Sequence, residues 1–282
     1  MSYPGLSPVG IGGIGGSGTR VIADFIRFMG YYIGDELSDA LDNLWFTLLF
    51  KRRLVLGEDL NTLSTLFEIF RTRMQRVSKF SEDQCYLIQQ LAVDERPQHT
   101  AQSLTEWAAS LLEEGKPLDG GQPWGWKEPN THVVIDRLLE IVPQLRYLHV
   151  IRDPFYLAHS QNQNQLETWG ALYLDREVSI GPRDAVSYSC AVHRRIADLV
   201  ERWPDQVMLV DYDDLCRSPI TAGSRISRFL NAPSPPSVLL EFAKTIRPPP
   251  STKAVETVDF DDFDPEDLAY IASLGYGTPR KG

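Results

Sequence analysis

Two groups of residues in this sequence have the types and spacing that suit the binding of phosphate groups. The first is residues 12–20, GGIGGSGTR, which follow a short apolar run and precede a helical pattern. Glycines let backbone N–H groups close around an anion at the positively polarised N-terminus of a helix. A nucleoside triphosphatase loop has Lys before its hydroxyl residue, but here Gly18 precedes Thr19 and Arg20 supplies the charge. We therefore predict a phosphate-binding loop of another kind.

The second group is Arg152 and Ser160, which follow the apolar run at residues 145–151. We expect Arg152 at the end of a strand and Ser160 on the second turn of the next helix, so that both face one pocket. A guanidinium group binds a phosphate dianion through two parallel hydrogen bonds, and a hydroxyl adds another donor. Arg followed by Asp after a strand is more often a structural ion pair, so this prediction depends on the glycine-rich loop being present as well.

The elements that position these residues are strands alternating with helices. We expect strands at residues 7–13, 31–33, 124–127, 145–151 and 207–210. Helices are expected between them, and residues 38 to about 115 are predicted to form a helical insertion. Alternation of this kind predicts a mainly parallel sheet with helices on both faces and ligands beyond the carboxyl ends of the strands. The two groups should therefore lie at one edge of the sheet.

The composition argues against several classes of function. The 282-residue chain has a formal net charge of −10, and a surface of that sign repels nucleic acid unless basic residues cluster. Its longest apolar run, residues 44–50, is far shorter than the roughly 20 residues of a membrane-spanning helix. The start of the sequence lacks the features of a secretory signal, and the three cysteines lack metal-ligand spacing. We expect no nucleic-acid partner, no transmembrane segment, no metal and a cytoplasmic location.

Taken together, the motifs resemble the sulfotransferase family, whose sulfuryl donor is 3′-phosphoadenosine 5′-phosphosulfate (PAPS). The resemblance rests on residues 15–20 (GGSGTR), residues 150–154 (VIRDP) and Ser160, and it extends to residues 124–129, 210–215 and 251–253. The loop is of a bacterial type, with a more distant similarity to protein-tyrosine sulfotransferases. The resemblance implies one α/β domain over residues 1–282 with a three-layer, P-loop NTPase-like fold. The insertion at about residues 38–115 would form the acceptor side.

The resemblance also implies a role for each matching residue. The loop residues that would hold the 5′-phosphosulfate are Gly15, Gly16, Ser17, Gly18, Thr19 and Arg20. Arg152 and Ser160 would hold the 3′-phosphate, and Lys127 would assist the departing phosphate. Tyr212 would contact the nucleotide, and a loop of Ser251, Thr252 and Lys253 would close over it. The product would be 3′-phosphoadenosine 5′-phosphate (PAP), and the reaction requires no metal.

The sequence departs from its relatives at two positions. Protein-tyrosine sulfotransferases carry Arg where Gly16 stands, so either Arg20 replaces that charge or the loop relies on backbone donors. Cytosolic sulfotransferases carry a catalytic His where Pro129 stands, so the general base must come from elsewhere.

An acidic segment supplies the candidates for that base. Glu36, in the sequence GDE at residues 34–36, matches the catalytic glutamate of protein-tyrosine sulfotransferases. The match needs a one-residue gap, so Asp35 is a close alternative, with Asp39 and Asp42 behind it. The same run is equally typical of a solvated, helix-capping stretch. His132 ranks second as a base, because a lone His in the first turn of a helix is more often a packing residue.

The acceptor and two other functions stay open. The acceptor would be a carbohydrate, a lipid or a small metabolite. The run of Lys51, Arg52 and Arg53 would either attract an anionic acceptor or only complement a helix C-terminus. The glycines at residues 10, 12 and 15 also match a dinucleotide-binding fingerprint, which would indicate a nicotinamide-dependent oxidoreductase. The third possibility is a nucleotide-binding protein without catalytic activity.

Overall fold

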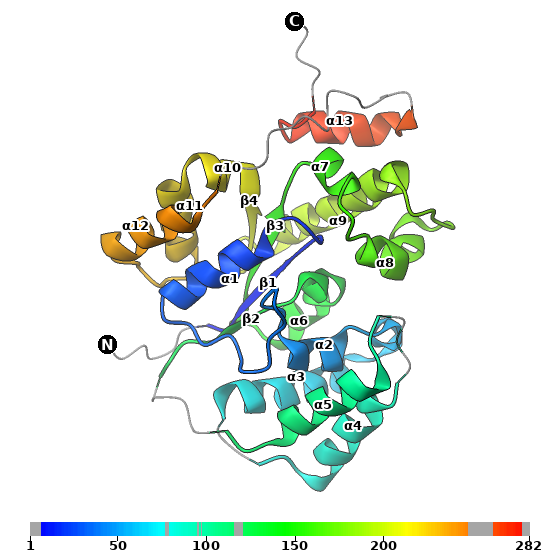
Figure 1. Ribbon diagram of the computed structural model, residues 1–282, viewed down its shortest axis with the longest axis vertical. Helices are drawn as coiled ribbons and strands as arrows, with labels where there is room; N and C mark the ends of the chain where they lie inside the picture. The colour runs from blue at the N-terminus through cyan, green and yellow to red at the C-terminus, as the bar shows by residue number, and fades with distance from the viewer. Residues whose placement is uncertain are drawn as a thin grey trace, which may run out of the picture.

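The computed structural model describes residues 7–76, 79–94, 96, 98–115, 121–247 and 262–277. At its centre is a parallel sheet of β1 (Val9–Gly13), β2 (Gly125–Lys127), β3 (Arg146–Ile151) and β4 (Val207–Asp211). The strand order is β2-β1-β3-β4, and each pair of neighbours is parallel (Figure 1). The expected α/β class with a parallel sheet is confirmed, and the strands end together at one side, which we call the carboxyl edge.

The prediction of a strand at residues 31–33 is wrong. Within the described residues, this segment joins the sheet only through a bridge between Tyr32 and Trp124. Gly30 and Gly34, on either side of it, have positive φ angles of 91° and 111° and turn the chain there. Too few residues lie between these turns to continue the hydrogen-bond ladder.

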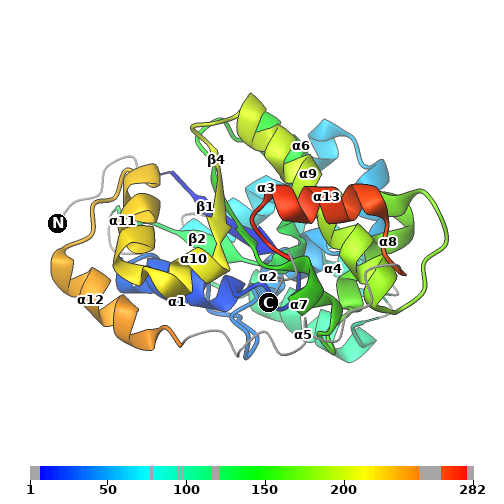
Figure 2. The ribbon, with the colours of Figure 1, turned by 90° about the horizontal axis from the view of Figure 1, so that it is seen from above.

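Side chains alternate between the two faces of the sheet, as the period of two in a strand requires. Val9, Ile11, Leu148 and Val150 pack in one cluster with helices that cover one face. These helices are α1 (Thr19–Phe28), α10 (Tyr212–Arg217), α11 (Pro219–Phe229) and α12 (Pro236–Thr245). Figure 2 shows this layer on one side of the strands.

The second face is covered by helices that follow β2 and β3. These are η2 (Pro129–Val133), α6 (Ile135–Ile141), α7 (Pro154–Ala158), α8 (Asn164–Leu174) and α9 (Pro182–Arg202). The last helix, α13 (Pro265–Ser273), lies against α9 (Figure 2), where Arg194 forms an ion pair of 2.7 Å with Asp267. Helices on both faces give the three layers predicted from the sequence.

A group of helices from residues 44–112 lies below the sheet in Figure 1. It consists of α2 (Leu44–Phe50), η1 (Arg53–Gly57), α3 (Leu60–Gln75), α4 (Glu82–Ala92) and α5 (Ala101–Leu112). Phe46, Phe67 and Phe70 pack against Trp124 and Trp126 at β2, with ring centroids 5.2 to 6.5 Å apart. This aromatic contact fixes the group of helices next to the carboxyl edge.

No helix in the described parts of the chain has both the length and the apolar character needed to cross a membrane.

Candidate functional site

The carboxyl edge brings the predicted site residues of all four strands together. Lys127 is the last residue of β2, the glycine-rich loop follows β1, and Arg152 and Tyr212 directly follow β3 and β4. Neighbouring strands in a sheet lie about 4.8 Å apart. The parallel sheet therefore places these residues side by side, although they are up to 200 residues apart in sequence.

The loop between β1 and α1 has the shape of an anion cradle. Gly16 and Gly18 have φ angles of 88° and 97°, a region that other residues rarely adopt. A Cβ atom on Gly18 would also lie 2.2 Å from the ring of Tyr212. The backbone N–H groups of Gly16 and Gly18 have no hydrogen-bond partner among the described residues. The buried hydroxyl of Ser17 has none either, so the loop can offer three polar groups to a ligand.

Gln165 on α8, which was not among the predicted site residues, supports this loop. Its Nε2 donates to the carbonyl of Gly13 at 3.2 Å, and its Oε1 accepts the N–H of Gly15. The bond occupies the N–H of Gly15, so Gly15 cannot donate to a ligand while it is made. Nothing in the sequence pairs residue 165 with the loop, because their proximity depends on how α8 packs.

Two of the glycines that match the dinucleotide-binding fingerprint, Gly10 and Gly12, are required by packing in the sheet. A Cβ atom on Gly10 would lie 2.8 Å from the ring of Trp126, and one on Gly12 would lie 2.2 Å from the Tyr147 hydroxyl. These two glycines make room for aromatic side chains of the neighbouring strands. The spacing therefore reflects packing within the sheet.

Arg152 is buried and links the two predicted anion-binding groups directly. Its Nη1 donates to the carbonyl of Gly16 at 3.0 Å. Its guanidinium carbon lies 3.4 Å from the ring centre of Tyr156 and 4.7 Å from that of Tyr212. Cation–π contacts of this kind hold the guanidinium plane in place. Tyr156 was not predicted, although its position four residues after Arg152, one helical turn away, was a usable signal.

Ser160 lies in a turn after α7, so its expected place on the second turn of a helix is wrong. Helix α7 ends at Ala158 because the side chain of Gln163 caps it. The Gln163 Nε2 donates to the carbonyls of Leu157, Ala158 and Ser160, at 3.1, 3.4 and 2.7 Å. The turn still brings Ser160 to the loop, since its hydroxyl would lie 3.4 Å from a Cβ atom on Gly16.

Lys127 is almost fully buried and is bonded to the acidic segment. Its ammonium group donates to the carbonyl of Ala40 at 3.1 Å and to the carboxylate of Asp42. Its own carbonyl accepts the N–H of Asn43 at 2.7 Å. Lys127 therefore holds the segment that contains all the acidic candidates at the carboxyl edge. Its ammonium group has a third N–H, besides the two used here, that can donate to a ligand.

The four acidic candidates have different surroundings. Asp35 forms an ion pair with Arg76, and Asp42 forms one with Lys127. Asp39 is exposed, and Glu36 is half-buried. Among the described residues, no cation lies within ion-pair distance of Glu36, so its carboxylate has no charged partner to displace.

His132 lies in the core, which does not suit a general base. It is fully buried, and its ring nitrogens lie 2.9 Å from the carbonyl of Pro129 and 3.1 Å from the hydroxyl of Tyr188. Burial lowers the pKa of His132 to about 3. His132 lies within η2, which Glu128 caps, because the Glu128 carboxylate accepts the backbone N–H of Asn130 at 2.5 Å.

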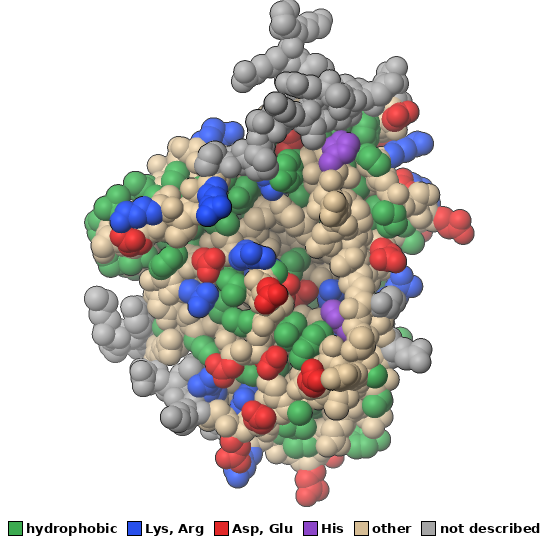
Figure 3. All heavy atoms as spheres, viewed as in Figure 1, with side chains coloured by type: hydrophobic (Ala, Val, Ile, Leu, Met, Phe, Trp, Pro, Cys, Tyr) green, Lys and Arg blue, Asp and Glu red, His purple; other side chains and the backbone are tan. Residues whose placement is uncertain are grey.

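Of the remaining predicted site residues, one is exposed and three lie outside the described residues. Arg20 is exposed on the first turn of α1, where its side chain can turn toward the loop. Figure 3 shows basic and acidic side chains interspersed over the middle of the face of the molecule that Figure 1 presents. Ser251, Thr252 and Lys253 lie outside the described residues.

Within the described residues, no group of three or more His, Cys, Asp or Glu is placed to hold a metal ion.

The chain is similar to known proteins in both sequence and structure. The model of a family described as "Sulfotransferase family" matches residues 51–236, more than half of the chain. The match includes Lys127, Arg152, Ser160 and Tyr212 but starts after the glycine-rich loop. No curated protein matches this sequence.

Three solved structures are similar over nearly the whole chain. A sulfotransferase domain from the curacin biosynthetic pathway has a TM-score of 0.50 and 15% identity, covering 99% of this chain and 100% of its own. One from the Synechococcus PCC 7002 olefin synthase has a TM-score of 0.49 and 17% identity, covering 99% and 98%. Sulfotransferase STF9 from Mycobacterium avium has a TM-score of 0.49 and 15% identity, covering 96% and 76%. The first of these likenesses supports the fold class.

Proposed function

This chain belongs to the sulfotransferase family, and we propose that it transfers a sulfuryl group from PAPS to a hydroxyl group of an acceptor. The contact between Arg152 and the carbonyl of Gly16 carries the proposal. This bond joins the two groups that we predict to bind anions, at one edge of the sheet. An adenylate with one phosphate at its 3′ position and another at its 5′ position suits two such groups.

The residues present fit this donor. The 5′-phosphosulfate would be held by the N–H groups of Gly16 and Gly18 and by the buried Ser17 hydroxyl, which has no partner among the described residues. Thr19 and Arg20, at the start of α1, would add a hydroxyl and a positive charge. The family resemblance predicts the same donors.

Arg152 and Ser160 would bind the 3′-phosphate. Of the five N–H donors of the Arg152 guanidinium, one is bonded to Gly16, so others can reach a phosphate. The ring of Tyr212, between Gly18 and Arg152, would contact the nucleotide. Ser251, Thr252 and Lys253 remain predicted to close over it.

When bound, PAPS supplies a sulfuryl group joined to its 5′-phosphate by a bridging oxygen. The acceptor oxygen forms a bond to sulfur, and the bond between sulfur and the bridging oxygen breaks, which leaves PAP. Negative charge grows on the departing phosphate, where Arg20, Lys127 and the loop N–H groups would stabilise it. No covalent intermediate with the protein is needed, so positioning and charge stabilisation dominate.

Glu36 would accept the proton of the acceptor hydroxyl. A general base needs a free carboxylate close to the reacting atoms. Asp35 and Asp42 already bind cations, and Asp39 is exposed. Glu36 combines partial burial with the absence of a charged partner among the described residues, and Lys127 holds its segment at the carboxyl edge.

Calorimetric titration with PAP and with 5′-AMP tests the donor assignment. We expect PAP to bind more tightly than 5′-AMP, and Arg152→Ala to remove most of that preference. A hydrogen bond to a charged group contributes about 1.5–3 kcal/mol, which is the size of the expected loss. Arg202→Ala, at the exposed end of α9, is the matched control and should change neither affinity. Equal affinity of the wild-type protein for both nucleotides would refute the proposal.

A further inference from the structure

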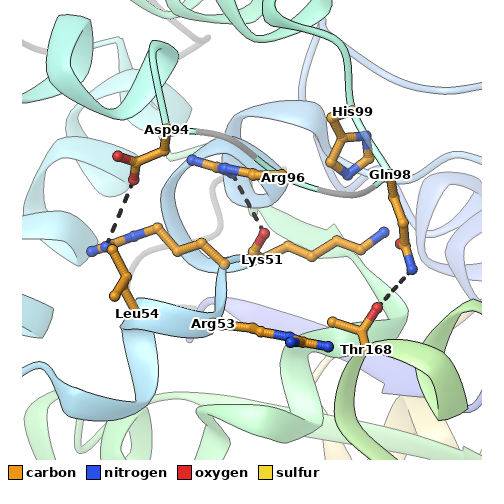
Figure 4. A pocket seen from close by; sticks show the side chains of 9 residues that line it. Lys51, Arg53, Leu54, Asp94, Arg96, Gln98, His99 and Thr168 are labelled. Atoms are coloured by element: carbon orange, nitrogen blue, oxygen red, sulfur yellow. Dashed lines mark hydrogen bonds and ion pairs between the residues drawn. The ribbon is translucent and has the colours of Figure 1, made fainter.

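A pocket rich in basic side chains lies between the helical insertion and α8. Its volume is about 160 Å³. Residues that line it, shown in Figure 4, include Lys51, Arg53, Arg96, Gln98, His99 and Thr168. They come from the end of α2 and the start of η1, from residues 96, 98 and 99, and from α8. We call it the basic pocket.

The basic pocket carries positive charge that its described neighbours do not neutralise. Arg52, also in its wall, forms ion pairs with Glu58 at 2.7 Å and with Asp94 at 4.0 Å. Arg53 donates to the main-chain carbonyl of Glu167 at 3.4 Å, and Lys51 forms no ion pair with a described residue. Asp94 is the one carboxylate among the described residues of the wall. A concave surface lined by one sign of charge attracts the opposite sign.

Two uncharged polar groups in the wall lack partners. The Nε2 of His99 and the Oε1 of Gln98 are buried and make no hydrogen bond within the described part of the structure. Desolvation and the nearby charges of Lys51 and Arg96 lower the pKa of His99 to about 4, so the ring is neutral at pH 7 and can donate one hydrogen bond. Buried polar atoms without partners are rare because they are costly, and a ligand oxygen that accepts from the His99 Nε2 would relieve that cost. The Gln98 Oε1 is an acceptor and needs a donor instead, such as the ammonium group of Lys51.

The side chains around these groups converge. In Figure 4 the ammonium group of Lys51 points toward His99 and Gln98. The Gln98 amide is held in place by the hydroxyl of Thr168, at 2.6 Å. The arrangement presents an ammonium group to the same space as the His99 ring, which donates from Nε2 in the tautomer protonated there.

Helix α8 connects the basic pocket with the glycine-rich loop. Gln165 binds the loop at Gly13, and Thr168, three residues further along the same helix, lines the basic pocket. Three residues of an α-helix span about 4.5 Å. On the other side, the charge of Lys51 acts on buried Glu128, the residue after Lys127. The basic pocket therefore borders the carboxyl edge on the side of the insertion.

We propose that the basic pocket binds an anionic group of the acceptor, so that the acceptor carries a phosphate or a carboxylate as well as the reacting hydroxyl. This inference rests on the proposed sulfuryl transfer. A volume of about 160 Å³ holds one such group with a few attached atoms, whereas a drug-sized ligand needs about 300 Å³ or more. The hydroxyl of a short acceptor would then lie toward the loop.

Three probes with one carbon skeleton and different charges test this inference. Glycerol 3-phosphate, glycerate and glycerol are titrated calorimetrically into PAP-saturated protein, in which the donor site is filled. We expect binding to weaken from the dianion to the monoanion and to be undetectable for glycerol. A ranking of phosphate above carboxylate, or the reverse, identifies which anion the pocket prefers.

Variants of the basic pocket locate the binding. Lys51→Met should weaken binding of the preferred anion at least tenfold, as expected for one charge-assisted hydrogen bond, and should leave the affinity for PAP unchanged. Arg71→Ala, an exposed arginine of α3 paired with Glu68, is the control and should change neither value. Anion binding that is insensitive to Lys51, or no difference between the anions and glycerol, would overturn the inference.

The outcomes separate this inference from the function it rests on. If PAP binds with the expected 3′-phosphate preference and the anions do not bind, the basic pocket is wrongly assigned and the donor site stands. If PAP does not bind, the anions are titrated into the free protein, and dependence on Lys51 would support an anion site while the proposed sulfuryl transfer fails.

Discussion

The carboxyl edge and the basic pocket are built in different ways. At the carboxyl edge, Lys127, Arg152 and Tyr212 lie at or directly after strand ends, so a parallel sheet alone brings them together. In the basic pocket, Lys51, His99 and Thr168 come from three segments that meet only because helices pack against each other. The edge therefore has a rigid geometry set by backbone, and the pocket has one set by side-chain packing.

The largest expected effect on PAP affinity comes from a substitution that disturbs the backbone of the loop at the carboxyl edge. Gly18→Ala would force a side chain into a left-handed conformation and against the ring of Tyr212. The loop must shift to relieve the clash, which moves the N–H groups proposed to bind the 5′-phosphate. Loss of two hydrogen bonds to a charged group, at about 1.5 kcal/mol each, would lower the affinity for PAP about a hundredfold. Calorimetric titration measures it, and circular dichroism confirms that the protein folds.

A glycine without these constraints is the control for Gly18. A Cβ atom on Gly57 would meet no atom within 4 Å, and its φ angle is outside the left-handed region. Gly57→Ala should bind PAP as the wild type does. Equal PAP affinities for the two variants would show that the backbone of the loop does not set donor binding.

A smaller effect separates two roles of Lys127, which holds the acidic segment and lies next to the loop. Lys127→Met and Asp42→Asn both remove the ion pair between these residues, so both should lower the melting temperature. We expect Lys127→Met alone to weaken PAP binding, by about tenfold, because it also removes a charge from the proposed donor site. If Asp42→Asn weakens PAP binding as much, Lys127 acts on the donor only through the acidic segment.

The difference between the two regions also explains what could be predicted from the sequence. The loop, Arg152 and Lys127 were found because motifs next to strand ends are local in sequence and the parallel sheet brings strand ends together. Gln165 was not predicted, because its partners in the loop lie about 150 residues away in sequence and no local pattern marks a packing contact. Of the basic pocket, the run of Lys51, Arg52 and Arg53 was noted as a possible site for an anionic acceptor, but His99 and Thr168 were not, for the same reason. The helix expected to carry Ser160 failed for a different reason, because Gln163, only three residues further on, ends it with its side chain, and the apolar spacing does not reveal such a local cap.

The smallest expected effect tests whether Ser160, displaced from its predicted helix, still belongs to the carboxyl edge. Its hydroxyl lies close to Gly16 and accepts the N–H of Asn162 at 3.2 Å, which leaves its own O–H free to donate. One such hydrogen bond contributes about 1 kcal/mol, so Ser160→Ala should weaken binding of PAP about fivefold and leave that of 5′-AMP unchanged. Combined with Arg152→Ala, the loss should be less than the sum of the two single losses, because both residues would hold one phosphate. Additive losses in the double variant would place Ser160 and Arg152 on different groups of the donor.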